Sequence, residues 1–134
     1  MGTLPINILI VLGGTSLPLA ATIAGLILWI KPPEINSKFG FRTRLSMRDE
    51  LAWHYAQKVS GRLMMSVFTP MTVISAVFCI SGIVNEFDDD KKFLLIIALI
   101  LTDIFLMIIV NTYIDRRLKK YVRENALSED GDEL

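Results

Sequence analysis

The chain has 134 residues, 52% of them hydrophobic and 21% charged, and its 14 basic and 14 acidic residues cancel to a formal net charge of zero. This composition excludes an ordinary soluble domain, because too much apolar surface would meet water, and it is typical of a small membrane protein. The single cysteine, Cys79, excludes an intramolecular disulfide.

Three windows of the chain are apolar and long enough to be membrane-spanning helices. A helix needs roughly 20 residues to cross about 30 Å of hydrocarbon. Residues 5–30 and 63–84 contain no charge, and residues 93–114 contain one, Asp103. We expect the first window to be a retained span and not a secretory signal, because no Lys or Arg precedes it and its apolar run is longer than a signal core. Residues 1–134 are therefore predicted to form a single all-α integral membrane domain.

Charged residues are segregated along the chain. Every Lys and Arg except Lys91 and Lys92 lies either between the first two windows or after the third, whereas the short segment 85–92 is rich in acidic residues. Basic residues are retained on the cytoplasmic side of a membrane, so the pattern predicts an outside N-terminus and a cytoplasmic C-terminus. The positions of the basic residues beside the spans account for them without nucleic acid as a partner. The polar, acidic segment of about 124–134 is expected to be disordered.

The segment 32–62 between the first two spans has a different character. Pro32 and Pro33 end the first helix, because neither can donate a backbone hydrogen bond. Gly40 then allows a turn that other residues avoid. Ser46 is expected to cap a new helix, with Asp49 three residues later completing a capping box.

From Met47 onward, apolar residues recur at helical spacing opposite a polar face that includes Gln57 and Gly61. This pattern predicts an amphipathic helix of about 14 residues that lies in the headgroup plane between the first and second spans. Trp53 would sit at its margin, and its basic residues would face anionic headgroups at the cytoplasmic surface.

The same segment carries a signature, which consists of Ile35-Asn36, Gly40-Phe41-Arg42-Thr43, Ser46-Met47, Trp53, Ala56 and Gly61. It resembles the signature of the SdpI family of small bacterial membrane proteins, although Phe41 stands where tyrosine is common. The resemblance extends from Lys31 to the end of the third span. We therefore expect a short form that has the signature module without the additional block of helices of longer members. The resemblance implies a location in the plasma membrane and a role in immunity to a membrane-active peptide toxin or in relaying its presence to a cytoplasmic regulator.

The polar residues of the signature allow two interpretations. Asn36, Arg42, Thr43 and Ser46 supply donors beside a predicted helix start, and such groups suit an anionic ligand such as a lipid phosphate or a carboxylate. With Gly40 and Trp53 they form the candidate partner-binding set. The same side chains could instead tie the turn to the ends of the spans. The sequence leaves both interpretations open.

Asp103 lies close to the middle of the third span. An ionised carboxylate there is costly, with estimates starting at about 2.5–3.5 kcal/mol, so the side chain should face protein or water and be neutral. Equal depth in the membrane predicts hydrogen bonds to Ser16, Thr72 and Ser75, and Asn111 lies two turns further along the third span. This intramembrane polar set could be a clasp between helices or a functional proton or ligand site.

The sequence contains no nucleophile–base arrangement, phosphate-binding glycine loop or cluster of metal ligands. We therefore predict a non-enzymatic protein without a cofactor, whose leading function is the SdpI-type role. The alternative is an oligomeric small transporter or channel subunit that uses Asp103, or an accessory subunit of a membrane complex. The expected partners are the lipid bilayer, a toxic peptide or a cytoplasmic regulator, and further copies of the chain.

Overall fold

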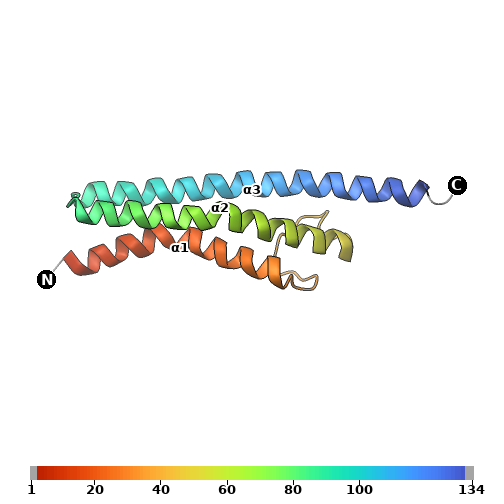
Figure 1. Cartoon of the computed structure of the whole chain (residues 1–134), viewed down its shortest axis with the longest axis horizontal. Helices are drawn as coiled ribbons and strands as arrows, with labels where there is room; N and C mark the ends of the chain where they lie inside the picture. The colour runs from red at the N-terminus through yellow and green to blue at the C-terminus, as the bar shows by residue number, and fades with distance from the viewer. Residues whose placement is uncertain (1–2, 132–134) are drawn as a thin grey trace.

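The computed structural model describes the backbone of residues 3–131 and the side chains of residues 7–126. Its elements are three helices, α1 (Thr3–Ile30), α2 (Glu50–Val84) and α3 (Asp89–Gly131). Consecutive helices are antiparallel and lie along one bundle axis (Figure 1). All three are long and apolar enough to cross a membrane. The prediction of an all-α protein with three such helices is confirmed.

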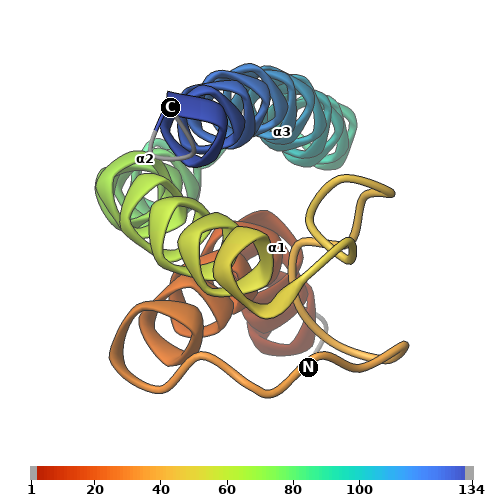
Figure 2. The same ribbon diagram turned by 90° about the vertical axis from the view of Figure 1, so that its right-hand side faces the viewer.

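Two of the helices are longer than a membrane span requires. With 35 and 43 residues, α2 and α3 extend roughly 52 Å and 65 Å, against a hydrocarbon core of about 30 Å. The surplus turns of both helices lie at the end of the bundle that carries the α1–α2 loop, where α3 extends beyond α2 (Figure 1). Viewed from that end, α2 lies between α1 and α3, and the loop covers one side (Figure 2).

The predicted interfacial helix between the first two spans is wrong. Helix α2 begins at Glu50 and continues without interruption to Val84. The apolar face assigned to the membrane surface packs on protein instead, with Ala52 and Ala56 buried against Leu118 of α3. Tyr55 also stacks on Tyr121, their ring centroids 3.9 Å apart. Helix α3 thus covers the part of this face formed by Ala52, Tyr55 and Ala56, whereas Leu51 stays exposed.

The start of α2 also differs from the predicted capping box. Asp49 is the N-cap residue, and its Oδ1 accepts a hydrogen bond of 2.7 Å from the backbone N–H of Ala52. This bond, with a second from Arg48, holds the pKa of the Asp49 carboxyl below its usual value. Ser46 lies outside the helix and has another role, described below. A carboxylate at the helix N-terminus also suits the positive end of the helix dipole.

The far end of α3 differs from expectation too. Its backbone is helical through Gly131, over most of the segment 124–134 for which the acidic composition predicts disorder. Residues 132–134 of that segment lie outside the described residues.

Close contact between α1 and α2 depends on two glycines. A Cβ atom added to Gly61 would lie 2.6 Å from the backbone nitrogen of Trp29 and 2.7 Å from the carbonyl oxygen of Gly25. A Cβ on Gly25 would lie 2.8 Å from the Cβ of Met64. Small residues let helices approach closely where both sides of the contact are apolar. Ala21 and Gly25 of α1 are buried, whereas Ser16 and Ala20 are exposed.

The core is a line of three clusters along the bundle. Near the α2–α3 turn, Cys79 packs with Leu99. In the middle, Phe68 packs with Val110, and at the loop end lies the Ala52–Ala56–Leu118 cluster. Many large apolar side chains on the outer faces are exposed, as expected for surfaces that meet acyl chains; examples are Ile23, Val73, Val77, Leu101, Phe105 and Ile108.

Gly61→Ala is expected to destabilise the bundle by roughly 1–3 kcal/mol, because the added methyl group must push the α1 backbone away. Gly13→Ala is the matched control, since its Cβ would meet a side-chain atom of Ile96 at an ordinary 3.6 Å. The unfolding midpoints of the two detergent-solubilised variants, measured by thermal unfolding, compare the effects of the two substitutions. Equal midpoints for the two variants would contradict the close crossing.

Candidate functional site

The signature loop between α1 and α2 is held together by its own side chains. Asn36 Oδ1 accepts hydrogen bonds of 2.8 Å from the backbone N–H groups of Lys38 and Phe39. Its Nδ2 donates to the carbonyl oxygen of Glu34, also at 2.8 Å. Such local bonding is what makes asparagine a turn-forming residue. Asn36 therefore closes the first turn of the loop.

Gln57 of α2 fixes the next part of the loop. Its side-chain Oε1 accepts from the backbone N–H of Phe41 at 2.8 Å, and its Nε2 donates to the carbonyl oxygen of the same residue at 3.0 Å. Gln57 is fully buried, so both bonds form away from water. Gly40 makes this approach possible, because its φ is +115° and a Cβ there would lie 2.6 Å from Gln57 Oε1.

Sequence reasoning missed Gln57 because the helical pattern placed it on the polar face. A signal was available: Gln57 lies four residues after Trp53 and four before Gly61, so it shares a helix face with two signature residues. A polar residue on the same helix face as two signature residues is a candidate for a buried polar contact.

Ser46 and Thr43 close the second turn of the loop. The Ser46 Oγ accepts from the backbone N–H of Thr43 at 2.8 Å and donates to the carbonyl oxygen of Phe41 at 2.9 Å. In return, the backbone N–H of Ser46 donates to Thr43 Oγ1 at 3.1 Å. Ser46 is fully buried. Its predicted role as a helix cap is wrong, because its hydroxyl is committed to backbone groups three and five residues earlier.

Trp53 joins the beginning of the loop to α2. Its indole Nε1–H donates a 2.6 Å hydrogen bond to the carbonyl oxygen of Pro33, and the side chain is fully buried. It does not lie at a membrane-facing margin of the helix. Ala56 and Gly61 are also used internally, in the packing against α3 and in the crossing with α1.

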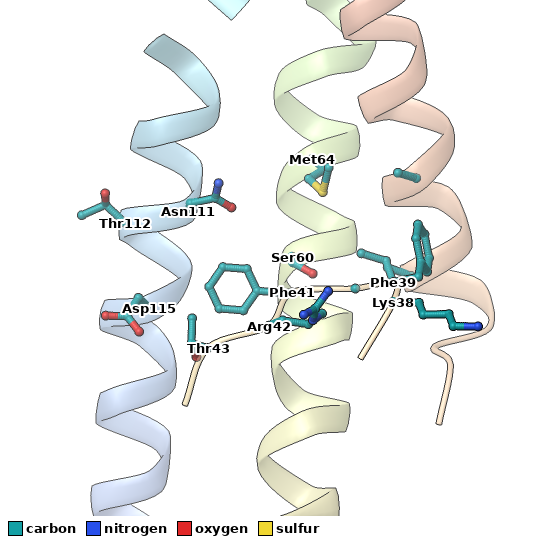
Figure 3. Close-up of a pocket in the computed structure, with 13 residues that line it drawn as sticks. Lys38, Phe39, Phe41, Arg42, Thr43, Ser60, Met64, Asn111, Thr112 and Asp115 are labelled. Atoms are coloured by element: carbon teal, nitrogen blue, oxygen red, sulfur yellow. The ribbon is translucent and has the colours of Figure 1, made fainter. Parts of the chain in front are cut away.

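Arg42 is the one charged residue of the signature, and it differs from the rest. Its side chain is exposed and makes no hydrogen bond or ion pair with any described residue. It borders a pocket of about 780 Å³ to which all three helices and the loop contribute. Figure 3 shows Arg42 beside Phe41, whose ring points from the loop toward α3. The lining residues are Ala24, Leu28, Lys38, Phe39, Gly40, Phe41, Arg42, Thr43, Ser60, Met64, Asn111, Thr112 and Asp115.

Asp103 faces protein as predicted, since it is 1% exposed. Neither of its carboxyl oxygens has a hydrogen-bond partner among the described residues, and the same is true of Ser75 Oγ. Because Cys79 packs with Leu99 and Phe68 with Val110, the antiparallel register places Ser75 opposite Asp103.

The other members of the intramembrane polar set do not join Asp103. Thr72 Oγ1 donates to the carbonyl oxygen of Phe68 in its own helix at 2.7 Å, and Ser16 is exposed. Asn111 is exposed and lines the pocket instead, because eight residues of helix rotate it by about 80° from Asp103. The predicted hydrogen bonds from Asp103 to Ser16, Thr72 and Ser75 are therefore wrong, although Ser75 does lie opposite Asp103 by register. Among the described residues, no group of three or more His, Cys, Asp and Glu side chains could hold a metal ion.

Gln57→Leu is expected to loosen the loop, because it leaves the backbone N–H of Phe41 without its partner, at a cost of roughly 1–3 kcal/mol for a buried group, while the C=O of Phe41 keeps only the hydrogen bond from Ser46 Oγ. Hydrogen exchange of the amides of residues 36–47 should become faster than in the unaltered protein. Lys58→Leu, at the exposed neighbouring position, is the control and should leave the exchange unchanged. Unaltered protection in Gln57→Leu would show that other contacts hold the loop.

Comparison with known proteins supports the resemblance carried by the signature. The model of the SdpI/YfhL protein family matches residues 33–111, more than half of the chain. The curated "Uncharacterized protein YfhL" of Bacillus subtilis (strain 168) is 46% identical over 43 residues, which are 31% of this chain and 39% of that protein. The match thus covers less than half of that relative. No solved structure matches the chain significantly. With three helices long and apolar enough to cross a bilayer, the chain is a multi-pass membrane protein that belongs to the SdpI/YfhL family.

Proposed function

We propose that the chain protects its cell from a membrane-active peptide toxin or relays the presence of that toxin to a cytoplasmic regulator. Membership of the SdpI/YfhL family supports this proposal through the role that the resemblance implies. The main structural observation behind the proposal is that most signature residues make contacts within the fold, whereas one signature residue does not. Gly40, Ser46 and Trp53 are used to fold the loop and Gly61 to pack α2 on α1, whereas Arg42 makes no hydrogen bond or ion pair with a described residue and lines a pocket.

A folded loop is a suitable docking element for such a role. Hydrogen bonds from Asn36, Ser46 and Gln57 hold its backbone before any partner arrives. Binding therefore does not have to order the loop, and less of the interaction free energy is lost to entropy. The guanidinium group of Arg42 can then offer several directed hydrogen bonds to an anionic group.

We further propose that the loop end of the bundle faces the cytoplasm of the plasma membrane and that the α2–α3 turn faces outward. All basic residues except Lys91 and Lys92 lie on the loop side, which supports this orientation. A regulator in the cytoplasm would then meet the signature directly. A toxin inserted in the bilayer would meet the exposed apolar faces of the helices.

The alternative of a transporter or channel subunit is not favoured by the geometry. Asp103, the residue on which it depends, is 1% exposed and packed between α2 and α3. An ion pathway needs its charged group on a water-filled surface.

The function is tested by deleting the gene and challenging the cells with pore-forming peptides, which should increase their sensitivity. The unaltered gene should restore tolerance and Arg42→Ala should not, because losing a charge-assisted contact of roughly 1.5–3 kcal/mol weakens binding about 10- to 100-fold. Arg44→Ala is the control, since Arg44 is exposed in the same loop but does not line the pocket. Full tolerance with Arg42→Ala would refute a role for this side chain, and failure of the variant to accumulate in the membrane would make it structural.

The orientation is tested with single cysteines at Ser37 and Asp89 in a Cys79→Ala background. An impermeant thiol reagent added to intact cells is expected to label the cysteine at position 89, the first residue of α3 after the α2–α3 turn, and not the one at position 37, in the loop. Labelling of position 37 alone would invert the topology and move the signature to the outer surface.

A further inference from the structure

The pocket beside Arg42 has an apolar wall and a polar rim. Ala24 and Leu28 of α1 and Met64 of α2 supply the wall. Lys38, Arg42 and Thr43 of the loop supply the rim, and Asn111 and Asp115 of α3 complete it. In Figure 3 the amide of Asn111 points toward the loop and the carboxyl group of Asp115 points away from it. Its volume of about 780 Å³ lies within the range of small-molecule sites in proteins. An occupant that matches both parts must be amphiphilic.

The charges of the rim favour an anion. The side chains of Lys38 and Arg42 make no ion pair with any described residue. Asp115 is the acidic residue of the lining, and its carboxylate is paired with Lys119 of the same helix at 2.6 Å. The pocket therefore offers two uncommitted cations against one compensated carboxylate. A guanidinium group suits phosphate oxygens in particular, because its donors form a planar fork.

The depth of the pocket favours a lipid over a free anion. Helix α1 ends at Ile30, so Ala24 lies roughly 9 Å below the end of the helix at 1.5 Å per residue. The wall thus extends over the distance that separates the headgroups from the upper acyl chains. Leu26 and Ile27, on the same turns of α1, are exposed, as expected for a surface already in contact with lipid. A phospholipid reaches such a site from the bilayer itself, where its local concentration is far higher than that of any soluble anion.

We propose that this pocket binds one anionic phospholipid, with its phosphate at Arg42 and Lys38 and the upper part of an acyl chain against Ala24, Leu28 and Met64. A toxic peptide with an acidic group is the competing occupant, but the continuity of the wall with the lipid-facing surface of α1 favours the lipid. The site does not rest on the proposed role in toxin tolerance, because a bound lipid would stabilise the loop end with or without a toxin.

The test is native mass spectrometry of the full chain, released from nanodiscs that contain equal amounts of phosphatidylglycerol and phosphatidylcholine with identical acyl chains. We expect one phosphatidylglycerol to be retained per chain in preference to phosphatidylcholine. Arg42→Gln should lower that retention roughly tenfold or more, and Arg44→Gln, outside the pocket, should not. Ala24→Phe should also lower this retention by filling the apolar part of the pocket, and an unfolding midpoint in lipid-free detergent equal to that of the unaltered chain would show that the fold is intact.

Four outcomes would overturn the proposal. An equal loss of phosphatidylglycerol retention in Arg42→Gln and Arg44→Gln would mean that the lipid is attracted to the positive charge of the loop as a whole and not to the pocket. Equal retention of both lipids would remove the role of lipid charge. If glycerol 3-phosphate displaced the bound phosphatidylglycerol as effectively as further phosphatidylglycerol does at the same concentration, the pocket would be a site for free phosphate groups. Binding of the toxin peptide to a chain that retains no lipid would make it a peptide site.

The same variants separate the lipid site from the proposed function. Arg42→Gln that retains phosphatidylglycerol but fails to restore tolerance would refute the lipid site and leave the function standing. Loss of the lipid with full tolerance would refute the role of Arg42 in tolerance and leave the lipid site standing.

Discussion

The pair of hydrogen bonds between the Gln57 side chain and the backbone of Phe41 determines how the loop end of the molecule is arranged. A buried primary amide must satisfy both a donor and an acceptor, and the backbone N–H and C=O of Phe41 offer the complementary pair. Because Gln57 belongs to the helix that continues as the second span, the bonds fix the loop to a rigid element. Phe41 is thereby held where its ring packs against the clusters formed by Phe68 and by Ala56.

The loop end is therefore a small folded unit that packs on α2 and α3. Helix α1 stops at Ile30, whereas α2 and α3 continue past it, so the loop packs against their surplus turns. The Gly25–Gly61 contact sets the distance between α1 and α2, and the Trp53–Pro33 hydrogen bond connects the end of α1 to the unit. Most hydrogen-bonding side chains of the signature are therefore already bonded within the protein. Two exposed cationic side chains of the loop, Lys38 and Arg42, line the pocket.

The middle of the bundle contains buried polar side chains without hydrogen-bond partners, which is unusual in proteins. Asp103 and Ser75 face each other by register, yet neither has a hydrogen-bond partner among the described residues. A carboxyl in such a place is tolerable when it is neutral, because desolvation of the charged form is what makes burial costly. Asp103 thus contributes polarity to the α2–α3 contact without forming the wider clasp that equal depth suggests.

The sequence by itself determined the features that depend on local composition. Long apolar windows determine the three helices, since about 20 residues with at most one charge are what a membrane-spanning helix requires. The cost of charge in lipid likewise turns Asp103 toward protein. The tertiary structure alone decided what depends on which distant surfaces meet. The face of Ala52 and Ala56 is equally suited to lipid or to a helix, and the presence of Leu118 of α3 selects the helix. Gln57 looks like a solvent-facing residue until the backbone of Phe41 is placed against it, because hydropathy patterns record how apolar a face is and not which polar groups pair across it.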